Sequence, residues 1–191
     1  LLLSIGGIVG IVVAAVVVLA IIIWAIATRN SFVSMQNQCE GSFHNIDIYL
    51  KKRYDLLPNM VNTVKGYAKY EGETLQSVIE ARSKAQNASS PAEKIEANAE
   101  LTQSIRNFNG VVERYPELKA NTNFLDLQNQ LKNIEGELAN VRKYYNACVL
   151  QFNKKIGYFP ANIIAGAMHL KKQPYFELDD VEERKNVKVE F

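Results

Sequence analysis

The chain has 191 residues, with 22 basic and 20 acidic side chains, and its net charge of +2 lacks the basic excess typical of a dedicated nucleic-acid-binding protein. Two cysteines, Cys39 and Cys148, are too few for a disulfide scaffold. Residues 1–27 carry no charge, whereas the remainder carries all of it and is long enough for one domain with a hydrophobic core.

The first 28 residues predict a transmembrane anchor. A helix of that length is about 40 Å long, which exceeds the ~30 Å of a bilayer core, and Trp24 near one end suits the headgroup boundary. The alternative is a signal peptide, since residues 25–27 resemble a cleavage site. The apolar run is much longer than the ~7–15 residues of a signal h-region, which favours the anchor. The positive-inside rule depends on residues before Leu1, so the side that the domain faces stays open.

A row of small residues lies in this anchor. Gly6, Gly10 and Ala14 have the spacing that lets two helices approach closely in lipid, which predicts packing between spans. The alternative is that small residues are simply common in apolar spans.

The rest of the chain is predicted to be helical. Over 121–157 the apolar positions recur in alternating steps of three and four, which is typical of left-handed helix packing. The same rhythm predicts one long helix over 29–88 and a shorter one over 91–115. Ser90 and Pro91 suit the start of the second helix. The predicted divisions are an anchor over 1–28, a helical bundle over 29–173 and a tail over 174–191.

Pro58 lies inside the longest periodic stretch, where it removes the hydrogen bond to the carbonyl of Tyr54. Side chains of Asp55 and Asn59 could bond to the freed backbone groups. One interpretation is a junction between two helices, and the other is a recognition surface built around a kink.

Several blocks of the sequence resemble the LemA family. The first is the stretch 52–69, Lys-Arg-Tyr-Asp-Leu-Leu-Pro-Asn-Met-Val-Asn-Thr-Val-Lys-Gly-Tyr-Ala-Lys, followed by 73–75 and 80–85. The others are 115–124, 144–160 and 175–177, in the family's order. One departure is Phe43, where family members often have tryptophan.

This resemblance implies a bacterial single-pass membrane protein that is all-α, with an N-terminal transmembrane helix followed by an antiparallel four-helix bundle with a very long first helix. It implies no established catalytic activity. The residues that carry the family motifs are interaction candidates: Arg53, Tyr54, Asp55, Pro58, Asn59, Tyr115, Pro116, Asn146, Asn153 and Pro160.

Two topologies fit the predicted helices. In an up-and-down bundle, the helix over 121–157 runs parallel to the first, and Cys39 lies far from Cys148. In a hairpin with a broken return arm, the two cysteines lie at similar heights. The resemblance favours the bundle, which predicts that no disulfide forms between them.

Motifs for catalysis are missing from the sequence: it has no HExxH or ExxH, no CxxC, no GxSxG and no glycine-rich phosphate loop. We therefore predict a non-enzymatic scaffold or assembly subunit of the bacterial cytoplasmic (inner) membrane. It would need no cofactor and no metal. The expected partners are the lipid bilayer and copies of itself, with another membrane protein as a further candidate, and no nucleic acid. The alternatives are an accessory subunit of a membrane protease or transporter, and an enzyme with an unrecognised site.

Overall fold

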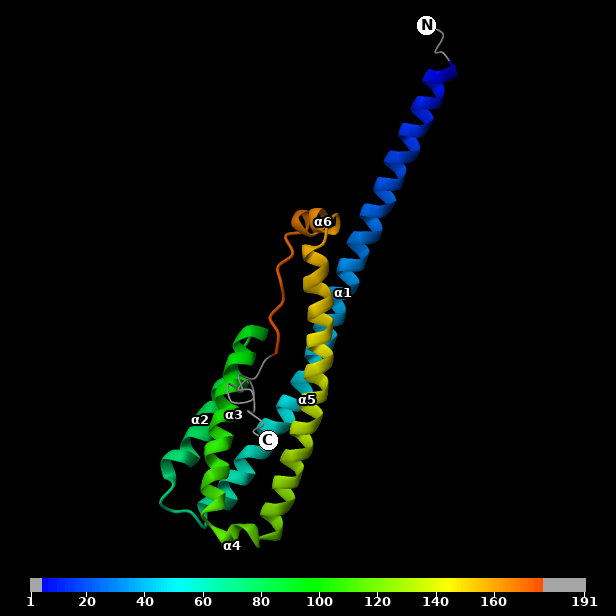
Figure 1. Ribbon diagram of the computed structural model, residues 1–191. Helices are drawn as coiled ribbons and strands as arrows, with labels where there is room; N and C mark the ends of the chain where they lie inside the picture. The colour runs from blue at the N-terminus through cyan, green and yellow to red at the C-terminus, as the bar shows by residue number, and fades with distance from the viewer. Residues whose placement is uncertain (1–4, 177–191) are drawn as a thin grey trace, which may run out of the picture. The chain divides into compact units, whose positions relative to one another are not determined.

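The computed structural model describes residues 5–176, and all regular structure among them is helical (Figure 1). In chain order the helices are α1 (Ile5–Lys65), α2 (Gly72–Asn87), α3 (Pro91–Glu113), α4 (Pro116–Lys119), α5 (Thr122–Gly157) and α6 (Ala161–Ala167). The all-α class predicted from the sequence is confirmed. Most of the predicted tail lies outside the described residues.

The chain divides into two compact units. The first unit comprises 1–41 and 147–173, and the second comprises 42–146 and 174–191. Because α1 and α5 are both long, each contributes its first part to one unit and its last part to the other. The predicted domain boundaries at residues 28 and 173 stay predictions.

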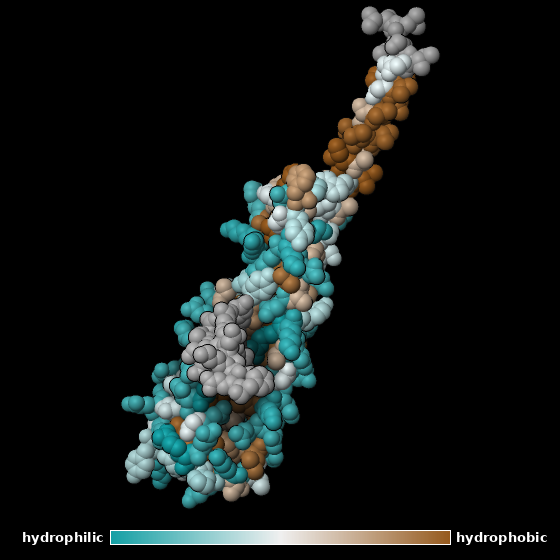
Figure 2. Space-filling model, in the orientation of Figure 1, coloured by the Kyte–Doolittle hydropathy of each residue, from teal (hydrophilic) through white to brown (hydrophobic). Residues whose placement is uncertain are grey.

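The N-terminal part of α1 is apolar on every side. It contains a window with a mean hydropathy of 3.2, none of which is buried, and helix α1 is long and apolar enough to cross a membrane. Figure 2 shows this stretch as an almost continuous apolar surface. Gly6, Gly10 and Ala14 lie exposed within it, so the row of small residues is uncovered, and packing between spans stays a prediction.

In the first unit, the two long helices pack through aromatic and aliphatic contacts. Phe32 on α1 meets Phe152 on α5 edge to face, with ring centroids 6.3 Å apart. Lys155 donates to the hydroxyl of Ser31, and its ammonium lies 5.3 Å from the centre of the Phe32 ring. Both side chains of the aromatic pair are fully buried, so this pair forms the core at that level.

In the second unit, helices α1 to α5 bury a larger core. Its fully buried members include Leu50, Leu57, Met60, Leu101, Phe108, Leu118, Phe124 and Leu138. Helix α3 begins at a capping box in which the Ser90 hydroxyl accepts from the backbone N–H of Glu93, and the Glu93 carboxylate accepts from the backbone N–H of Ser90. The start predicted from Ser90 and Pro91 is therefore confirmed.

The single helix predicted over 29–88 is wrong. Helix α1 ends at Lys65, and a turn over 66–71 separates it from α2. Two glycines, Gly66 and Gly72, flank the turn, and glycine is a poor helix former. The apolar rhythm continues across the turn because Ala68 within it is itself buried, so periodicity alone gave no sign of the break.

The extra helix reverses the expected direction of α5. Phe43 packs edge to face on Tyr145 at 5.3 Å, while Arg53 meets Glu135, so residue numbers rise along α1 as they fall along α5. Helices α1 and α5 are therefore antiparallel, not parallel as the predicted topology had them. The reason is that the turn at 66–71 adds one reversal of the chain.

The predicted separation of the two cysteines is wrong for the same reason. Cys39 on α1 and Cys148 on α5 are both buried in the first unit, close enough for their charges to interact. Burial, helped by the nearby Cys148, raises the pKa of the Cys39 thiol to about 11. Both cysteines are therefore buried side chains packed on neighbouring helices, and the Cys39 thiol is neutral at physiological pH.

Candidate functional site

Pro58 lies within α1, which continues past it to Lys65, so the interpretation as a helix junction is wrong. The carbonyl of Tyr54, which loses its usual partner because proline has no N–H, accepts a hydrogen bond of 2.6 Å from Nε of Arg82 on α2. A guanidinium from the neighbouring helix thus replaces the missing backbone donor. Asp55 and Asn59, which were expected to fill this role, are both exposed.

The hydroxyl of Tyr54 is held by a second helix, α3. It lies 3.0 Å from Oδ1 and 2.7 Å from Nδ2 of Asn98 on α3, and both side chains are buried. Burial raises the pKa of Tyr54, and the bond to Asn98 offsets only part of that effect. The phenol is therefore protonated over the physiological range and serves as a fixed link between α1 and α3.

Arg53 is the largest fully buried side chain of the described residues, with 1% of its surface exposed. Its Nη2 donates to the hydroxyl of Thr102 at 3.0 Å, and its Nε lies 2.8 Å from Oε1 of Glu135. The Nε–H does not point at that oxygen, so the contact is an ion pair, and neither Nε nor Nη1 has a hydrogen-bond partner among residues 5–176. Each unmade hydrogen bond of a buried donor costs about 1–3 kcal/mol.

Glu135 serves two cations at once. Its Oε2 lies 3.8 Å from Nη2 of Arg142, whose guanidinium also stacks 5.4 Å from the ring centre of Phe176. Burial lowers the pKa of Arg142 to about 10, and burial also lowers the pKa of Arg53 despite the opposing effect of Glu135. Arginine stays charged at neutral pH, so a single carboxylate faces two positive charges, one fully buried and one partly buried.

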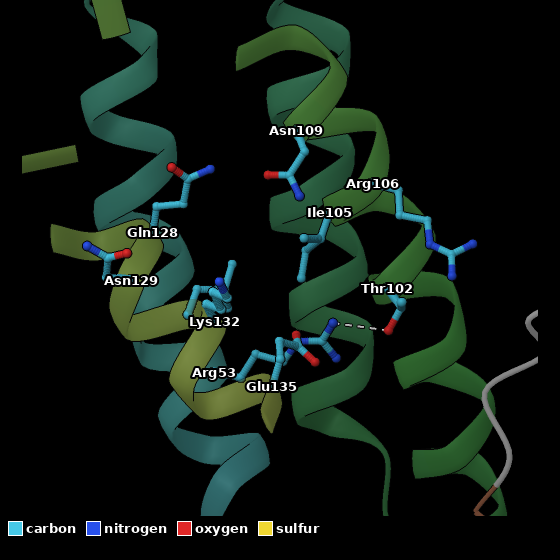
Figure 3. A pocket seen from close by; sticks show the side chains of 10 residues that line it. Arg53, Thr102, Ile105, Arg106, Asn109, Gln128, Asn129, Lys132 and Glu135 are labelled. Atoms are coloured by element: carbon cyan, nitrogen blue, oxygen red, sulfur yellow. Dashed lines mark hydrogen bonds and ion pairs between the residues drawn. The ribbon is translucent and has the colours of Figure 1, made fainter. Parts of the chain in front are cut away.

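Arg53 lies at the wall of a pocket of about 520 Å³ within the second unit (Figure 3). Helix α1 contributes Arg53, and helices α3 and α5 contribute the other walls. The lining consists of Arg53, Thr102, Ile105, Arg106, Asn109, Gln128, Asn129, Leu131, Lys132 and Glu135. This volume lies in the range of small-ligand pockets, and polar side chains predominate among those that line it.

Two other family-motif residues lie near the turns of the second unit. Tyr115 is half-buried, with its hydroxyl 3.5 Å from Oε1 of Glu71, and Oε2 of the same carboxylate binds Arg114 at 2.9 Å. Pro116 is exposed and starts α4, where a missing N–H costs nothing. These residues lie at the turns that join the helices, and they do not line the Arg53 pocket.

Asn146 and Asn153 both hold the extended chain after α6. In the second unit, Asn146 accepts from the N–H of Phe176 at 2.8 Å and donates to its carbonyl at 3.2 Å. In the first unit, Asn153 makes the same pair of bonds with Gln173, both at 2.9 Å. Each carboxamide therefore clasps the two backbone groups of one residue. Pro160 is exposed at the start of α6, after a cis peptide bond.

The pocket combines residues that sequence reasoning found with others that it missed. Arg53 was a candidate, whereas Thr102, Lys132 and Glu135 were not. These three are polar residues that fall between the apolar positions of their helices, a pattern that predicts exposure to solvent. Arg82 was within a family block but was given no role. The usable signal was the unmatched carbonyl at Tyr54, which required a donor from elsewhere in the chain.

The fold and the apolar end of α1 define the class of the protein: an all-helical bundle with a candidate membrane anchor. The sequence profile of the LemA family matches residues 42–191, and the chain belongs to this family. The LemA family is not a known enzyme family, and its function is unsettled.

Named relatives are similar over most of the chain. Protein LemA of Metamycoplasma hominis is 27% identical over 161 residues, which cover 82% of this chain and 72% of the relative. The magnetosome proteins MamQ 1 and MamQ 2 of Paramagnetospirillum magneticum are each 21% identical over 192 residues, covering 87% of this chain and 71% of the relative.

Proposed function

We propose that the protein is a non-enzymatic scaffold or assembly subunit, anchored in the bacterial cytoplasmic membrane by a single pass of α1. It acts through contacts with other proteins and with further copies of itself. Membership of the LemA family supports association with a membrane, and the apolar part of α1 supplies a helix of suitable length.

The observation that carries the proposal is a group of exposed apolar side chains where α5 ends and α6 begins. Tyr158 is 62% exposed, Phe159 81% and Ile163 58%. Removing large apolar side chains from water is favourable, so their exposure is costly unless a partner covers them. Aromatic residues are also enriched at protein interfaces. This group therefore suits a contact surface.

The test is the mass of the detergent-extracted particle, measured by light scattering with identification of every chain that co-purifies. A defined homo-oligomer is the expected result. A monomer across the micromolar range would contradict self-assembly. Stable co-purification with a protease or transporter would instead favour an accessory subunit.

Two sets of variants separate the contributions to assembly. Tyr158→Ser with Phe159→Ser removes aromatic surface from the bundle, whereas Gly6→Leu with Gly10→Leu blocks close approach of two spans. We expect the first pair to lower the oligomer mass. The second pair lowers it only if the anchor also contributes to the interface.

A further inference from the structure

The Arg53 pocket carries more positive than negative charge. Arg53 and Lys132 line it together with Arg106, which has an interaction of its own, and Glu135 is its only carboxylate among the described residues. That carboxylate is also paired with Arg142, so it cannot fully offset the charge of Arg53. Lys132 has no ion-pair partner within residues 5–176, so an anionic group entering the pocket would meet an attraction that the described residues leave unmatched.

The pocket also has hydrogen-bond donors without acceptors. Nη1 of Arg53 makes no hydrogen bond within residues 5–176, although only 1% of the side chain is exposed, and Nε meets Glu135 as an ion pair without a hydrogen bond. Lys132 forms no ion pair and no hydrogen bond within residues 5–176. Arginine and lysine at one site favour an oxyanion, and the fork of a guanidinium matches the two oxygens of a carboxylate.

Three carboxamides distinguish between classes of oxyanion. Asn109, Gln128 and Asn129 line the pocket and have no hydrogen-bond partner in the described part of the chain. A carboxamide offers one acceptor and two donor hydrogens, as the backbone of a peptide also requires. A free phosphate would use mainly the donors, because most of its oxygens are acceptors at neutral pH. The mixture of cations and carboxamides therefore suits a peptide with acidic side chains better than an inorganic anion.

We infer that this pocket binds an acidic peptide segment of a partner protein, with a side-chain carboxylate directed to Arg53 and Lys132 and the peptide backbone bonded to the carboxamides. The inference rests on the proposed function and deepens it, since it gives the chemistry of the partner. A buried arginine whose hydrogen bonds are incomplete is then a binding group held ready for its ligand.

The test uses the full chain in detergent micelles and acetyl-tetraglutamate amide as the probe. Isothermal calorimetry at low ionic strength measures its binding, because screening by salt weakens exposed charge pairs. Acetyl-tetraglutamine amide is the matched neutral probe, and inorganic phosphate is the free-anion probe. We expect saturable binding of the acidic peptide and at least tenfold weaker binding of the other two.

Three variants locate the binding. Lys132→Glu reverses an exposed charge in the pocket and should weaken binding about tenfold or more. Lys143→Glu makes the same change at an exposed position of α5 outside the pocket and should leave affinity within about twofold. Glu135→Gln removes the competing carboxylate and should tighten binding several-fold, a gain that loss of structure would not produce. Circular dichroism checks that each variant is folded.

Each outcome decides the inference separately from the proposed function. No saturable binding up to millimolar peptide, or equal effects of the Lys132 and Lys143 substitutions, would overturn it. Binding of phosphate as tight as that of the peptide would also overturn it, in favour of a site for free anions. A monomeric particle that still binds the peptide through Lys132 would contradict self-assembly but support the pocket.

Discussion

Replacing Arg82 with methionine removes the donor that satisfies the Tyr54 carbonyl. The lost bond is short, at 2.6 Å, and its donor is charged, so its removal should cost about 1.5–3 kcal/mol of unfolding free energy. In a bundle of this size, about 4 °C of melting temperature corresponds to 1 kcal/mol, which predicts a loss of about 6–12 °C. Thermal unfolding of the full chain in detergent, followed by circular dichroism, measures it.

The proline makes a double-mutant cycle possible. In Pro58→Ala the restored N–H at position 58 can bond to the same carbonyl, and alanine also has a higher helix propensity, so this variant should keep its fold and gain stability. The loss of unfolding free energy caused by Arg82→Met should then be smaller, by about 1 kcal/mol or more, in the Pro58→Ala background than in the original chain. The difference between the two costs isolates the hydrogen bond.

Lys84 supplies the control for this cycle. It lies two residues further along α2 and forms an exposed ion pair of 2.6 Å with Glu100. Lys84→Met should leave the melting temperature nearly unchanged in both backgrounds, since exposed pairs contribute little. An equal cost of Arg82→Met with and without Pro58 would refute the reasoning, because Arg82 would then act through contacts unrelated to the freed carbonyl.

Three further changes test other contacts. Asn146→Ala removes both bonds to Phe176 and should lower stability by about 1–2 kcal/mol and speed proteolysis at that end of the chain, which limited digestion would detect. Burial raises the pKa of Cys39 from 9.0 to about 11, so its contribution to stability should be fully present below pH 9 and be lost as the pH rises from about 9 through 11. For the same reason, alkylation of Cys39 at pH 8 should be about 100-fold slower than that of an exposed thiol. A smaller fall in stability between pH 9 and 11 in Cys39→Ser than in the original chain would confirm the source, because the buried Tyr54 contributes its own fall at high pH in both proteins. A short bifunctional reagent should link Cys39 to Cys148 within one chain. Arg53→Met should change stability by less than about 1 kcal/mol, since it removes a buried, incompletely bonded charge, whereas a purely structural role predicts a loss of about 3–5 kcal/mol in unfolding titrations.

Periodicity predicted the helical class and the start of α3, because apolar spacing and capping residues act locally. It could not predict the turn at 66–71, since Ala68 continues the buried pattern while the backbone reverses. One missed reversal changed the direction of α5 and brought Cys148 beside Cys39 instead of far from it. An error in one connection therefore propagated to every contact of the later helix.

The candidate site was less predictable than the fold because its members come from three helices. Arg53 stood in a family motif, but nothing near it in the sequence indicated that it would be buried or that Glu135, 82 positions later, would face it. For Pro58, the chemistry of proline predicted that the Tyr54 carbonyl would lose its backbone partner. It did not predict the replacement donor, because Arg82 lies on another helix. Side-chain pairing across helices depends on rotation and register, which periodic spacing does not fix.

The clasps formed by Asn146 and Asn153 have a consequence for which substitutions the extended chain tolerates. Each carboxamide bonds only to the N–H and carbonyl of one residue, so these bonds do not depend on the side chain at that position. Many residue types are therefore compatible with a clasped position, but proline is not, because it has no N–H. Proline occurs at 174, between the clasped residues Gln173 and Phe176, where only its carbonyl is used, by the hydroxyl of Tyr145. Moving that proline by one residue toward the N-terminus would break a clasp without altering composition.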